Sequence, residues 1–292
     1  MKLFFYRSHI PNFGDELNPW LLPKIFEDFF DDDPTELFLG IGSILYDDHP
    51  KDPTKIVFGS GYGGYTSKPT LDLTWKVYGV RGPRTAEALG LEKDAGIGDA
   101  AILINRYRIP NRKITHKFGF IPHWESLARG RWPEVCRIAN IHFLDPSAPV
   151  EQVLEEIQEC EIVIAEAMHG AIVADALRVP WIPVLPIDSN HHFKWHDWAE
   201  ALDVQFEPQK LKPSTSAEIW TKVTGKKGGT AGKMLHRLDK NLKPLSNYLI
   251  DLACHSLVNA AKTEPYLSTD KSMDRAVDRL SEAARKILSD FK

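Results

Sequence analysis

The sequence predicts an α/β protein built on a doubly wound, mostly parallel sheet. Short apolar runs rich in β-branched residues alternate with helical patterns, and this alternation favours parallel strands joined by crossover helices. The predicted strands, in chain order, are Lys2–Tyr6, Leu37–Ile41, Lys55–Gly59, Trp75–Val80, Lys117–Ile121, Ile141–Leu144, Glu161–Ala165, Trp181–Leu185 and Val204–Glu207.

Residues 159–185 are the clearest strand–helix–strand unit. Ile162–Ala165 is a brief apolar run typical of a buried strand, Ala171–Leu177 has helical character, and Pro180 precedes the next strand. His169 and Gly170 are therefore expected on the intervening turn, at the carboxyl edge of the sheet. Ligands bind at that edge, helix N-termini there favour anions, and a histidine can exchange protons near neutral pH.

Length and composition exclude several classes of protein. The 292 residues suffice for two domains of ordinary size, and the hydrophobic fraction of 43% with a net charge of −4 indicates a globular protein that is not a general nucleic-acid binder. Cys136, Cys160 and Cys254 are widely spaced, which favours a reducing compartment over a disulfide framework or zinc knuckle. The apolar start, Leu3–Tyr6, is too short for a signal sequence. We therefore expect a cytoplasmic protein whose membrane contact, if any, is peripheral.

Composition also predicts where the chain divides. The polar segment Asn105–Lys113 contains a proline and separates two series of strands, which places a linker between domains at residues 1–108 and 114–215. Residues 216–292 are expected to form a loop and a helical extension. Within them, Lys222–Lys233 is rich in Lys, Gly and Thr, and apolar residues from Met273 to Phe291 recur at amphipathic helical spacing.

The first cluster of candidate site residues follows the first strand. Asn12 and Gly14 suit a tight turn, and Asp15 is expected to cap the following helix. Capping alone explains these residues, but Asp15 is also suited to accept a proton from a sugar hydroxyl that Asn18 orients.

Glycines and arginines follow the next strands. The turns Gly40–Ser43 and Gly59–Gly64 offer backbone N–H groups to an anion, but neither matches a dinucleotide-binding or P-loop pattern. Arg81 and Arg84 follow the Trp75–Val80 strand, where two guanidinium groups can grip a carboxylate and a phosphate. Tight turns and surface charge are the alternative interpretations.

Histidines and tryptophans mark the second half. His123 follows a strand, as His169 does, and Gly96–Asp99 is expected to cap a helix or line a cleft between the domains. In Asn190–Trp198, the i, i+4 pair of histidines gives a weak metal pattern, because no HExxH motif or nearby cysteine accompanies it. Trp195 and Trp198 suit stacking on a sugar face, with packing in the core as the alternative.

Taken in order, these segments resemble one known family. The series NFGDELN, GIGS, RGPR, GDAA, IPHW and MHGAIVADALRVP, within about residues 9–200, is similar to the polysaccharide pyruvyl transferases, especially their bacterial exopolysaccharide branch. The resemblance implies two Rossmann-like domains in a B-type glycosyltransferase-like arrangement with a cleft between them. It also implies transfer from phosphoenolpyruvate to a hexose diol, which forms a pyruvate ketal and phosphate without a cofactor or metal.

The resemblance, together with the residue types, assigns roles to the candidates. The catalytic residues are expected to be His169 as acid and either Asp15 or His123 as base. The expected donor-binding residues are Arg81, Arg84, Gly170, Ser43 and Gly61. The expected acceptor-binding residues are Asn12, Asn18, His192, Lys194, Trp195 and Trp198.

One departure from the family pattern concerns the donor. Many members have an arginine two residues before this histidine, where the present chain has Ala167. The candidates to replace that cation are Arg178, Lys194, His191 and His192. Two other functions stay open: a B-type glycosyltransferase that uses a nucleotide sugar, and a non-catalytic glycan-binding member. A lipid-linked acceptor would bring Lys222–Lys233 near anionic headgroups.

Overall fold

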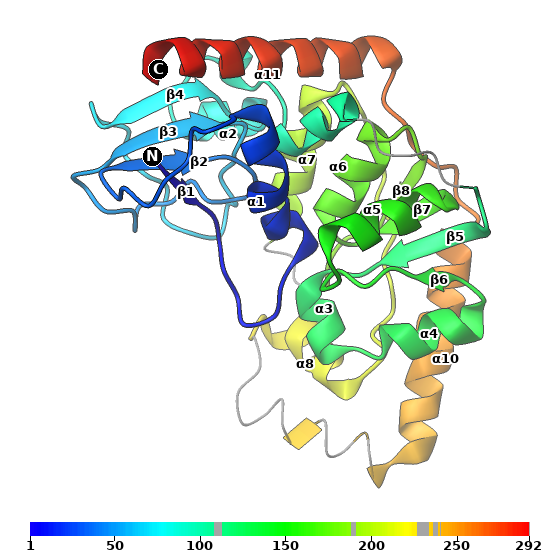
Figure 1. Cartoon of the computed structure of the whole chain (residues 1–292). Coiled ribbons are helices and arrows are strands. Elements are labelled where there is room, and N and C mark those ends of the chain that lie inside the picture. Colours follow the sequence, from blue (N-terminus) through cyan, green and yellow to red (C-terminus); the bar gives the residue numbers. More distant parts are fainter. Residues whose placement is uncertain (108–112, 188–190, 227–233, 236–238, 240, 292) are drawn as a thin grey trace.

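The strands form two parallel sheets of four strands each. The computed structural model describes residues 1–107, 113–187, 191–226, 234, 235, 239 and 241–291 (Figure 1). The first sheet has the order β1 (Lys2–Phe4), β2 (Glu36–Leu39), β3 (Thr54–Phe58), β4 (Trp75–Gly79). The second has the order β6 (His142–Phe143), β5 (His116–Ile121), β7 (Cys160–Ala165), β8 (Trp181–Pro183). The predicted α/β class and eight of the nine predicted strands are confirmed.

The ninth predicted strand, Val204–Glu207, is wrong. These residues lie in no strand, and the nearest pairing is an isolated bridge between Val184 and Gln209. The side chain of Phe206 instead packs among tryptophan rings. Its apolar character therefore reflects burial against a helix and not a ladder of backbone hydrogen bonds.

Helices follow β1, β4 and each strand of the second sheet, whereas β2, β3 and β4 succeed one another in the described chain without a helix between them. In chain order the helices are α1 (Phe13–Ile25), α2 (Pro83–Ala88), η1 (Lys93–Ala95), η2 (Ala100–Arg106), α3 (Trp124–Arg129), α4 (Trp132–Ala139), α5 (Val150–Gln158), α6 (Met168–Ala176), α7 (His192–Ala201), α8 (Ser216–Thr224), α10 (Lys243–Ala260) and α11 (Asp270–Phe291). Among the described residues, no helix combines the length and the apolar character needed to cross a bilayer.

Two helices begin earlier than the sequence predicts. The α1 helix starts at Phe13, so Asn12 is the N-cap residue and Asp15 lies in the first turn without capping it. Likewise α6 starts at Met168, which places His169 in the first turn of the helix and not on the preceding loop. Both polar side chains therefore project from helix N-termini, where the backbone N–H groups carry partial positive charge.

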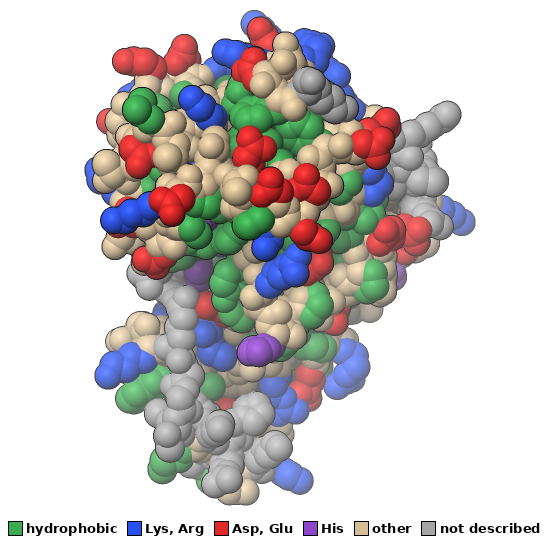
Figure 2. All heavy atoms as spheres, turned by 60° about the vertical axis from the view of Figure 1, so that its left-hand side comes forward, with side chains coloured by type: hydrophobic (Ala, Val, Ile, Leu, Met, Phe, Trp, Pro, Cys, Tyr) green, Lys and Arg blue, Asp and Glu red, His purple; other side chains and the backbone are tan. Residues whose placement is uncertain are grey.

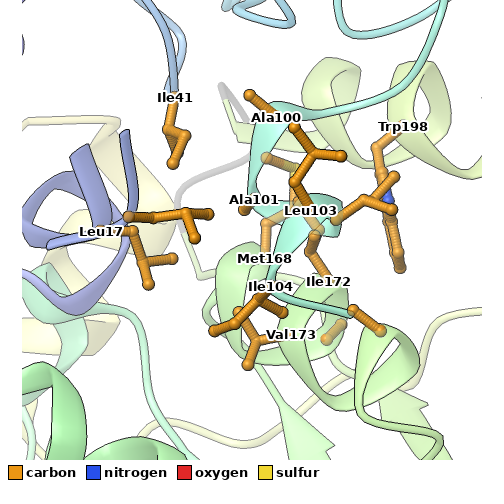
Figure 3. Packing of buried hydrophobic residues seen from close by; sticks show 14 of the residues in the cluster. Leu17, Ile41, Ala100, Ala101, Leu103, Ile104, Met168, Ile172, Val173 and Trp198 are labelled. Carbon is orange, nitrogen blue, oxygen red and sulfur yellow. The ribbon is translucent and has the colours of Figure 1, made fainter. Parts of the chain in front are cut away.

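The core between the two sheets is continuous. Figure 3 shows η2 packed between Leu17 of the first half and Met168, Ile172 and Trp198 of the second. The predicted linker begins inside this packed element, because the Asn105 side chain donates to the Ala176 carbonyl at 2.9 Å. Residues 108–112 of that linker lie outside the described residues. Apolar packing thus joins the two sheets at this point.

The last two helices pack against different sheets. The α10 helix contacts α4 beside the second sheet, whereas α11 returns to β4 and η2 and lies along the first sheet (Figure 1). The predicted amphipathic pattern is confirmed, since Met273, Val277, Leu280 and Ile287 of α11 are buried. Of the predicted loop Lys222–Lys233, the first residues end α8 and residues 227–233 lie outside the described residues.

Candidate active site

A cavity of about 660 Å³ lies where the carboxyl ends of strands from both sheets meet. The loops and helices after β1, β2, β5 and β7 supply most of its wall, which is the edge where α/β proteins bind ligands. The polar and ionisable side chains in this wall are Tyr6, Asn12, Asp15, Ser43, Tyr46, Asp48, Tyr65, Thr66, His123, Glu125, His169, His191 and Lys194.

His169 is held between two residues of the first half. A β-carbon at Gly14 would overlap the His169 ring, far inside the 3.0 Å limit of real Cβ contacts, so only glycine leaves room for the imidazole. On the other side, the His169 Nε2 lies 3.6 Å from the Asp99 Oδ2. The Asp99 Oδ1 accepts the Ala101 N–H at 3.0 Å, and its Oδ2 has no hydrogen bond within the described part of the chain. The buried carboxylate is therefore placed to orient the imidazole.

Asp15 faces the same cavity from α1. Its carboxylate accepts a hydrogen bond from the Asn12 side chain at 2.7 Å. Burial raises the pKa of Asp15 above its ordinary value, while the Asn12 hydrogen bond and the charges of His169 and Lys194 act in the opposite direction. A carboxylate with a raised pKa is a stronger base than an exposed one, which suits proton abstraction from a hydroxyl.

The surroundings of His123 disfavour the protonated form of its imidazole. Burial lowers the pKa of the His123 imidazole well below its ordinary value, and the charges of Lys194 and His191 lower it further. The His123 Nδ1 accepts the Glu125 N–H at 3.4 Å at the start of α3, so the neutral ring carries its proton on Nε2. With Nδ1 engaged and Nε2 protonated, His123 is poorly suited to be the base.

One group of side chains in the cavity has the composition of a metal site. Ligating atoms of His123, Glu125 and His191 lie within 4.8 Å of one another, the one such trio among the described residues. Arg129 also lies 3.3 Å from the Glu125 carboxylate, and the charge of Lys194 acts on His123. Cations already surround the trio's carboxylate, so the surroundings favour an anion over a metal ion.

The predicted weak metal pair, His192 and His196, does not form a site with other ligands in the described part of the chain. The His192 ring lies 3.4 Å from the Pro186 carbonyl, and the His196 ring stacks on Phe206. Asn190 at the start of that predicted segment lies outside the described residues.

The sequence is similar to a known protein family and to a known bacterial protein. A sequence model of the polysaccharide pyruvyl transferase family matches residues 12–189, which is more than half of the chain. The chain belongs to this family. The succinoglycan biosynthesis protein ExoV of Rhizobium meliloti (strain 1021) is 39% identical over 229 residues, 76% of the present chain and 71% of that protein. The family resemblance predicted from the sequence is thereby confirmed.

The fold brings six of the predicted site residues of this pyruvyl transferase family member to the cavity. They come from four segments of the first 170 residues and from α7: Asn12, Asp15, Ser43, His123, His169 and Lys194. These six of the fourteen predicted site residues meet here because the carboxyl ends of strands from both sheets face the same cavity.

Arg81, predicted to grip the donor, does not line the cavity. Its side chain is fully buried, its Nε pairs with Asp197 at 2.9 Å, and its other nitrogens donate to the Ser43 hydroxyl and the Tyr62 carbonyl, each at 2.8 Å. A β-carbon at Gly61 would overlap the guanidinium. Arg81 and Gly61 thus lie behind the wall, where Arg81 positions Ser43.

Arg84 also lies outside the cavity. Its half-exposed guanidinium pairs with Glu200 of α7 at 2.5 Å on the surface. Neither arginine of the predicted donor-binding pair therefore lines this cavity. The helix α2 does begin after the β4 strand, as predicted, but it turns Arg84 toward α7.

Four further predicted residues serve the scaffold. Trp195 and Trp198 are fully buried beside Trp181, so the prediction of an exposed stacking surface is wrong and the packing alternative holds. Asn18 is buried and exchanges hydrogen bonds with the Ile41 backbone at 2.8 and 2.9 Å, which holds the loop after β2. Gly170 permits close packing of α6 on Ile121.

The structure also adds a residue that sequence reasoning missed. Glu166 directly follows β7 and is buried, and burial raises the pKa of its carboxyl to about 8. It accepts hydrogen bonds from the His123 N–H and the Ser126 hydroxyl, both at 2.8 Å. Glu166 therefore fixes the start of α3 beside the cavity. Its position after an apolar strand and before the family motif was the available signal.

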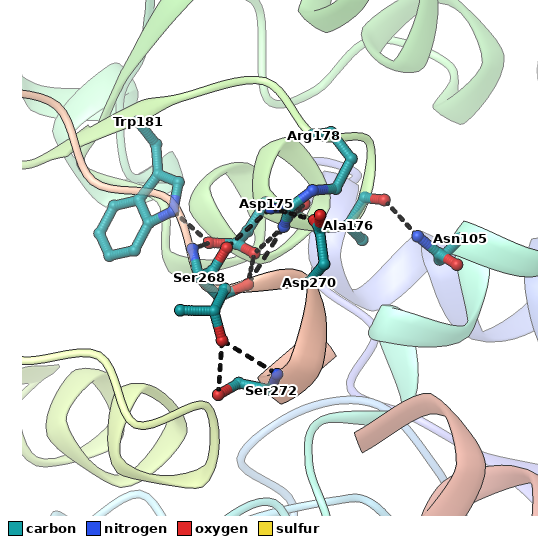
Figure 4. A network of polar contacts seen from close by, with 9 residues as sticks. Asn105, Asp175, Ala176, Arg178, Trp181, Ser268, Asp270 and Ser272 are labelled. Atoms are coloured by element: carbon teal, nitrogen blue, oxygen red, sulfur yellow. Dashed lines mark hydrogen bonds and ion pairs between the residues drawn. The ribbon is translucent and has the colours of Figure 1, made fainter. Parts of the chain in front are cut away.

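The structure separates the candidates that stand in for the family arginine at Ala167. Arg178 lies at the other end of α6 from His169 and bonds to Asp175, Ser268 and Asp270 (Figure 4). His192 is not part of the cavity wall, whereas His191 and Lys194 are. Lys194 is the candidate with a permanent charge near both Asp15 and His123.

Proposed function

We propose that this protein transfers pyruvate from phosphoenolpyruvate to a hexose diol of an exopolysaccharide or its precursor, with formation of a cyclic pyruvate ketal and release of phosphate. Family membership supports the reaction class. The observation that carries the proposal is the meeting of His169, Asp15 and Lys194, an acid, a base and a cation, in one cavity. The proposed donor is an intracellular metabolite, so we place the reaction in the cytoplasm.

The donor requires positive charge for its phosphate and its carboxylate. Lys194 and His191 supply it from one side, and the N-terminal N–H groups of α6 supply partial positive charge from another. The Ser43 hydroxyl, held by Arg81, offers a further donor. The cavity volume lies within the usual range of about 300–1,000 Å³ for small-molecule sites, which leaves room for a sugar ring beside the donor.

His169 is the proposed general acid. As the first sugar oxygen attacks C2 of the donor, the electron pair of the C2=C3 double bond takes a proton from the imidazolium, and the methylene becomes a methyl group. The Asp99 carboxylate, 3.6 Å from the Nε2 of the ring, is the proposed group that orients the ring for this transfer. A positioned acid of this kind contributes about 10²–10⁴-fold to a rate.

Asp15 is the proposed general base. It removes the proton of the attacking hydroxyl, with its carboxylate held by Asn12. The C2–O bond to phosphate then breaks, the bonding electrons leave with the phosphate, and the second hydroxyl oxygen bonds to C2. Its proton returns to the neutral His169, and the proton on Asp15 leaves with the phosphate. Both side chains are thus restored.

Tyr6 and Tyr65 are the proposed sugar-binding surfaces. Both line the cavity, and their side chains are 49% and 43% exposed, as a face for stacking requires. They take the place that the sequence had suggested for Trp195 and Trp198. The acceptor sugar is proposed to enter the cavity beside Tyr6 and Tyr65 as part of a larger glycan, including a glycan linked to lipid.

The first experiment is thermal unfolding with phosphoenolpyruvate, inorganic phosphate and UDP-sugars as separate additives. A ligand that favours the folded state at about 100 times its dissociation constant stabilises it by about 2.7 kcal/mol. We expect a shift with phosphoenolpyruvate that exceeds the shift with phosphate, that is lost in Lys194→Ala and that persists in Arg84→Ala.

Two outcomes would redirect the assignment. A shift with UDP-sugars alone would indicate a B-type glycosyltransferase. No shift with any additive, combined with binding of the glycan and no turnover, would indicate the non-catalytic member.

A further inference from the structure

Exposed hydrophobic side chains concentrate at one end of the molecule. Of the fourteen large hydrophobic residues that are exposed in the described part of the chain, half lie between residues 219 and 248. Six of them form what we call the α8–α10 surface: Ile219, Trp220, Val223, Leu242, Leu245 and Tyr248. Scattered exposed hydrophobics are normal in a globular protein, but a cluster of this kind marks an interaction surface.

The same stretch is strongly basic. Residues 219–248 contain seven Lys and Arg and one Asp in a chain whose net charge is −4, and three of these lysines lie in the part of the range that the structure describes. Lys222, Lys226 and Lys243 are exposed beside the hydrophobic side chains. The single acidic residue, Asp239, is buried and bonds to Ser216, so it does not neutralise them. In Figure 2, blue Lys and Arg side chains and green hydrophobic side chains lie near one another at the lower end of the molecule.

Polar bonds anchor the two helices to the fold beneath this surface. The Arg131 N–H donates to the Ser214 hydroxyl just before α8, and its guanidinium donates to the Ser246 hydroxyl in α10, each at 2.8 Å. Asp239 joins the start of α8 at Ser216. The inner faces are thus used for folding, and the hydrophobic side chains on the outer faces are left to a partner.

The chemistry of the surface identifies the partner. Tryptophan and tyrosine next to apolar side chains suit the boundary between lipid tails and headgroups, and interleaved lysines suit anionic headgroups. We infer that the α8–α10 surface binds the face of an anionic lipid bilayer. A folded acidic protein would match the charge but not this combination of exposed apolar residues and exposed lysines.

The position of this surface relative to the cavity gives the contact a consequence. The Thr215 hydroxyl at the start of α8 donates to the Arg129 carbonyl at the end of α3 at 2.8 Å, and Trp132 donates to Glu218 at the same distance. Helix α3 supplies Trp124 and Glu125 to the cavity wall. Docking through α8 and α10 therefore brings the cavity wall close to the bilayer.

The test is flotation of the purified chain with vesicles, without any substrate. Vesicles of phosphatidylcholine alone are compared with vesicles of phosphatidylcholine and phosphatidylglycerol. We expect binding to the anionic vesicles only. This binding should weaken at least tenfold when the salt concentration is raised, because the screening length of surface charges is about 8 Å at physiological ionic strength and becomes shorter at higher salt.

Matched variants separate this surface from general charge. Reversal of Lys222, Lys226 and Lys243 to Glu should lower binding at least tenfold, whereas reversal of the exposed Lys51, Lys76 and Lys271 should leave it within twofold. Val223→Ser with Tyr248→Ser should weaken binding, whereas Leu73→Ser, at a still more exposed site elsewhere, should not. These residues are exposed, and an unchanged melting temperature confirms that the variants fold.

Several results would overturn the inference. They are failure to bind anionic vesicles, equal binding to neutral vesicles, and an equal loss of vesicle binding in the two triple-lysine variants. Binding to an acidic polymer such as heparin without binding to vesicles would instead assign the surface to an acidic macromolecule. Because no substrate is present, each result is independent of the proposed reaction.

Discussion

Gly14 and His169 lie in direct contact although 154 positions separate them in the chain. The imidazole of His169 occupies the space that a β-carbon at Gly14 would need. Gly14 lies in the first turn of α1 and His169 in the first turn of α6, so the contact joins the two halves of the molecule beside the cavity. The position of the His169 ring, from the last family motif, therefore explains why position 14, in the first motif, is a glycine.

This contact predicts that Gly14→Ala lowers the free energy of unfolding, which is the opposite of the usual effect of Gly→Ala in a helix. At a helical position without steric conflict, Gly→Ala stabilises a protein by about 0.4–1 kcal/mol. Here we expect a lower free energy of unfolding and a loss of transfer activity of about 10²-fold, since a displaced catalytic group costs that much. In the His169→Ala background the same change should become stabilising. Urea unfolding of the four proteins measures the cycle, and stabilisation by Gly14→Ala alone would refute the contact.

Asp99 is predicted to act through His169 and not on the substrate. Asp99→Asn keeps the capping oxygen for the Ala101 N–H but removes the charge beside Nε2. We expect kcat to fall at least tenfold, the KM for phosphoenolpyruvate to stay within twofold, and the melting temperature to change little. In His169→Ala, kcat should fall by about 10²–10⁴-fold. Steady-state kinetics decide, and a raised KM with unchanged kcat would assign Asp99 to binding instead.

Variants of Lys194 and Arg84 should show which of these residues binds the donor. Lys194 lines the cavity, whereas Arg84 was predicted from the sequence and lies outside it. Loss of a charged hydrogen-bonding partner costs about 1.5–3 kcal/mol, which is a rise of about 10–150-fold in the KM for phosphoenolpyruvate for Lys194→Ala. Arg84→Ala should leave the KM within twofold, because its ion pair lies on the surface. Lys194→Arg should recover part of the loss. If Arg84→Ala raised the KM as much as Lys194→Ala, the cavity would not be the donor site.

Asp197 is predicted to matter for stability. It accepts hydrogen bonds from the Arg81 guanidinium, the Thr85 N–H and the Thr85 hydroxyl within the buried contact between α2 and α7. Asp197→Ala leaves the Arg81 charge buried without its partner and should lower the free energy of unfolding by about 3–5 kcal/mol. The exposed counterpart, Glu200→Ala, should cost about 0–1 kcal/mol. Chemical denaturation measures both, and equal costs would contradict the burial of the pair.

Glu166 predicts a pH dependence of stability. The pKa of its carboxyl is raised by burial from 4.5 to about 8, so between these values the folded state holds a proton that the unfolded state has released. The free energy of unfolding should therefore fall as pH rises from about 4.5 to 8, by up to about 1.4 kcal/mol per pH unit. Below pH 4.5 this contribution is constant.

The control is Glu166→Gln. Its amide can still accept from the His123 N–H and donate to the Ser126 hydroxyl, so the fold keeps both contacts. Its stability should show a smaller decline over the same pH range. Parallel stability curves for the two proteins would show that Glu166 is ionised in the folded state.

The fold class and eight strands could be read from the sequence because they depend on local apolar periodicity. The runs at Ile162–Ala165 and Lys55–Gly59 are buried on both faces, and such strands are recognisable one at a time. Val204–Glu207 failed because Phe206 is buried against tryptophans without pairing to a strand. The family was also recognisable from ordered motifs, without knowledge of any contact.

The site was only partly predictable. Asp15 follows a strand of the first sheet, and His123 and His169 follow strands of the second, so the rule places each at the carboxyl edge of its own sheet. That the two edges face one cavity was not predictable from it. The rule says nothing of the direction in which a side chain points, and so Arg81, Arg84, Trp195 and Trp198 were placed at the cavity although they lie behind or outside it.

The sequence by itself thus determined the α/β class, the positions of eight strands along the chain, the family and the residues that follow each strand. Only the tertiary structure decided that Gly14 makes room for His169, that Asp99 stands behind it, and that Arg81 is buried on Asp197. The physical reason is the range of the interactions. Strands and helices follow from neighbouring residues, whereas the orientation and charge of a side chain depend on the atoms that distant segments pack around it.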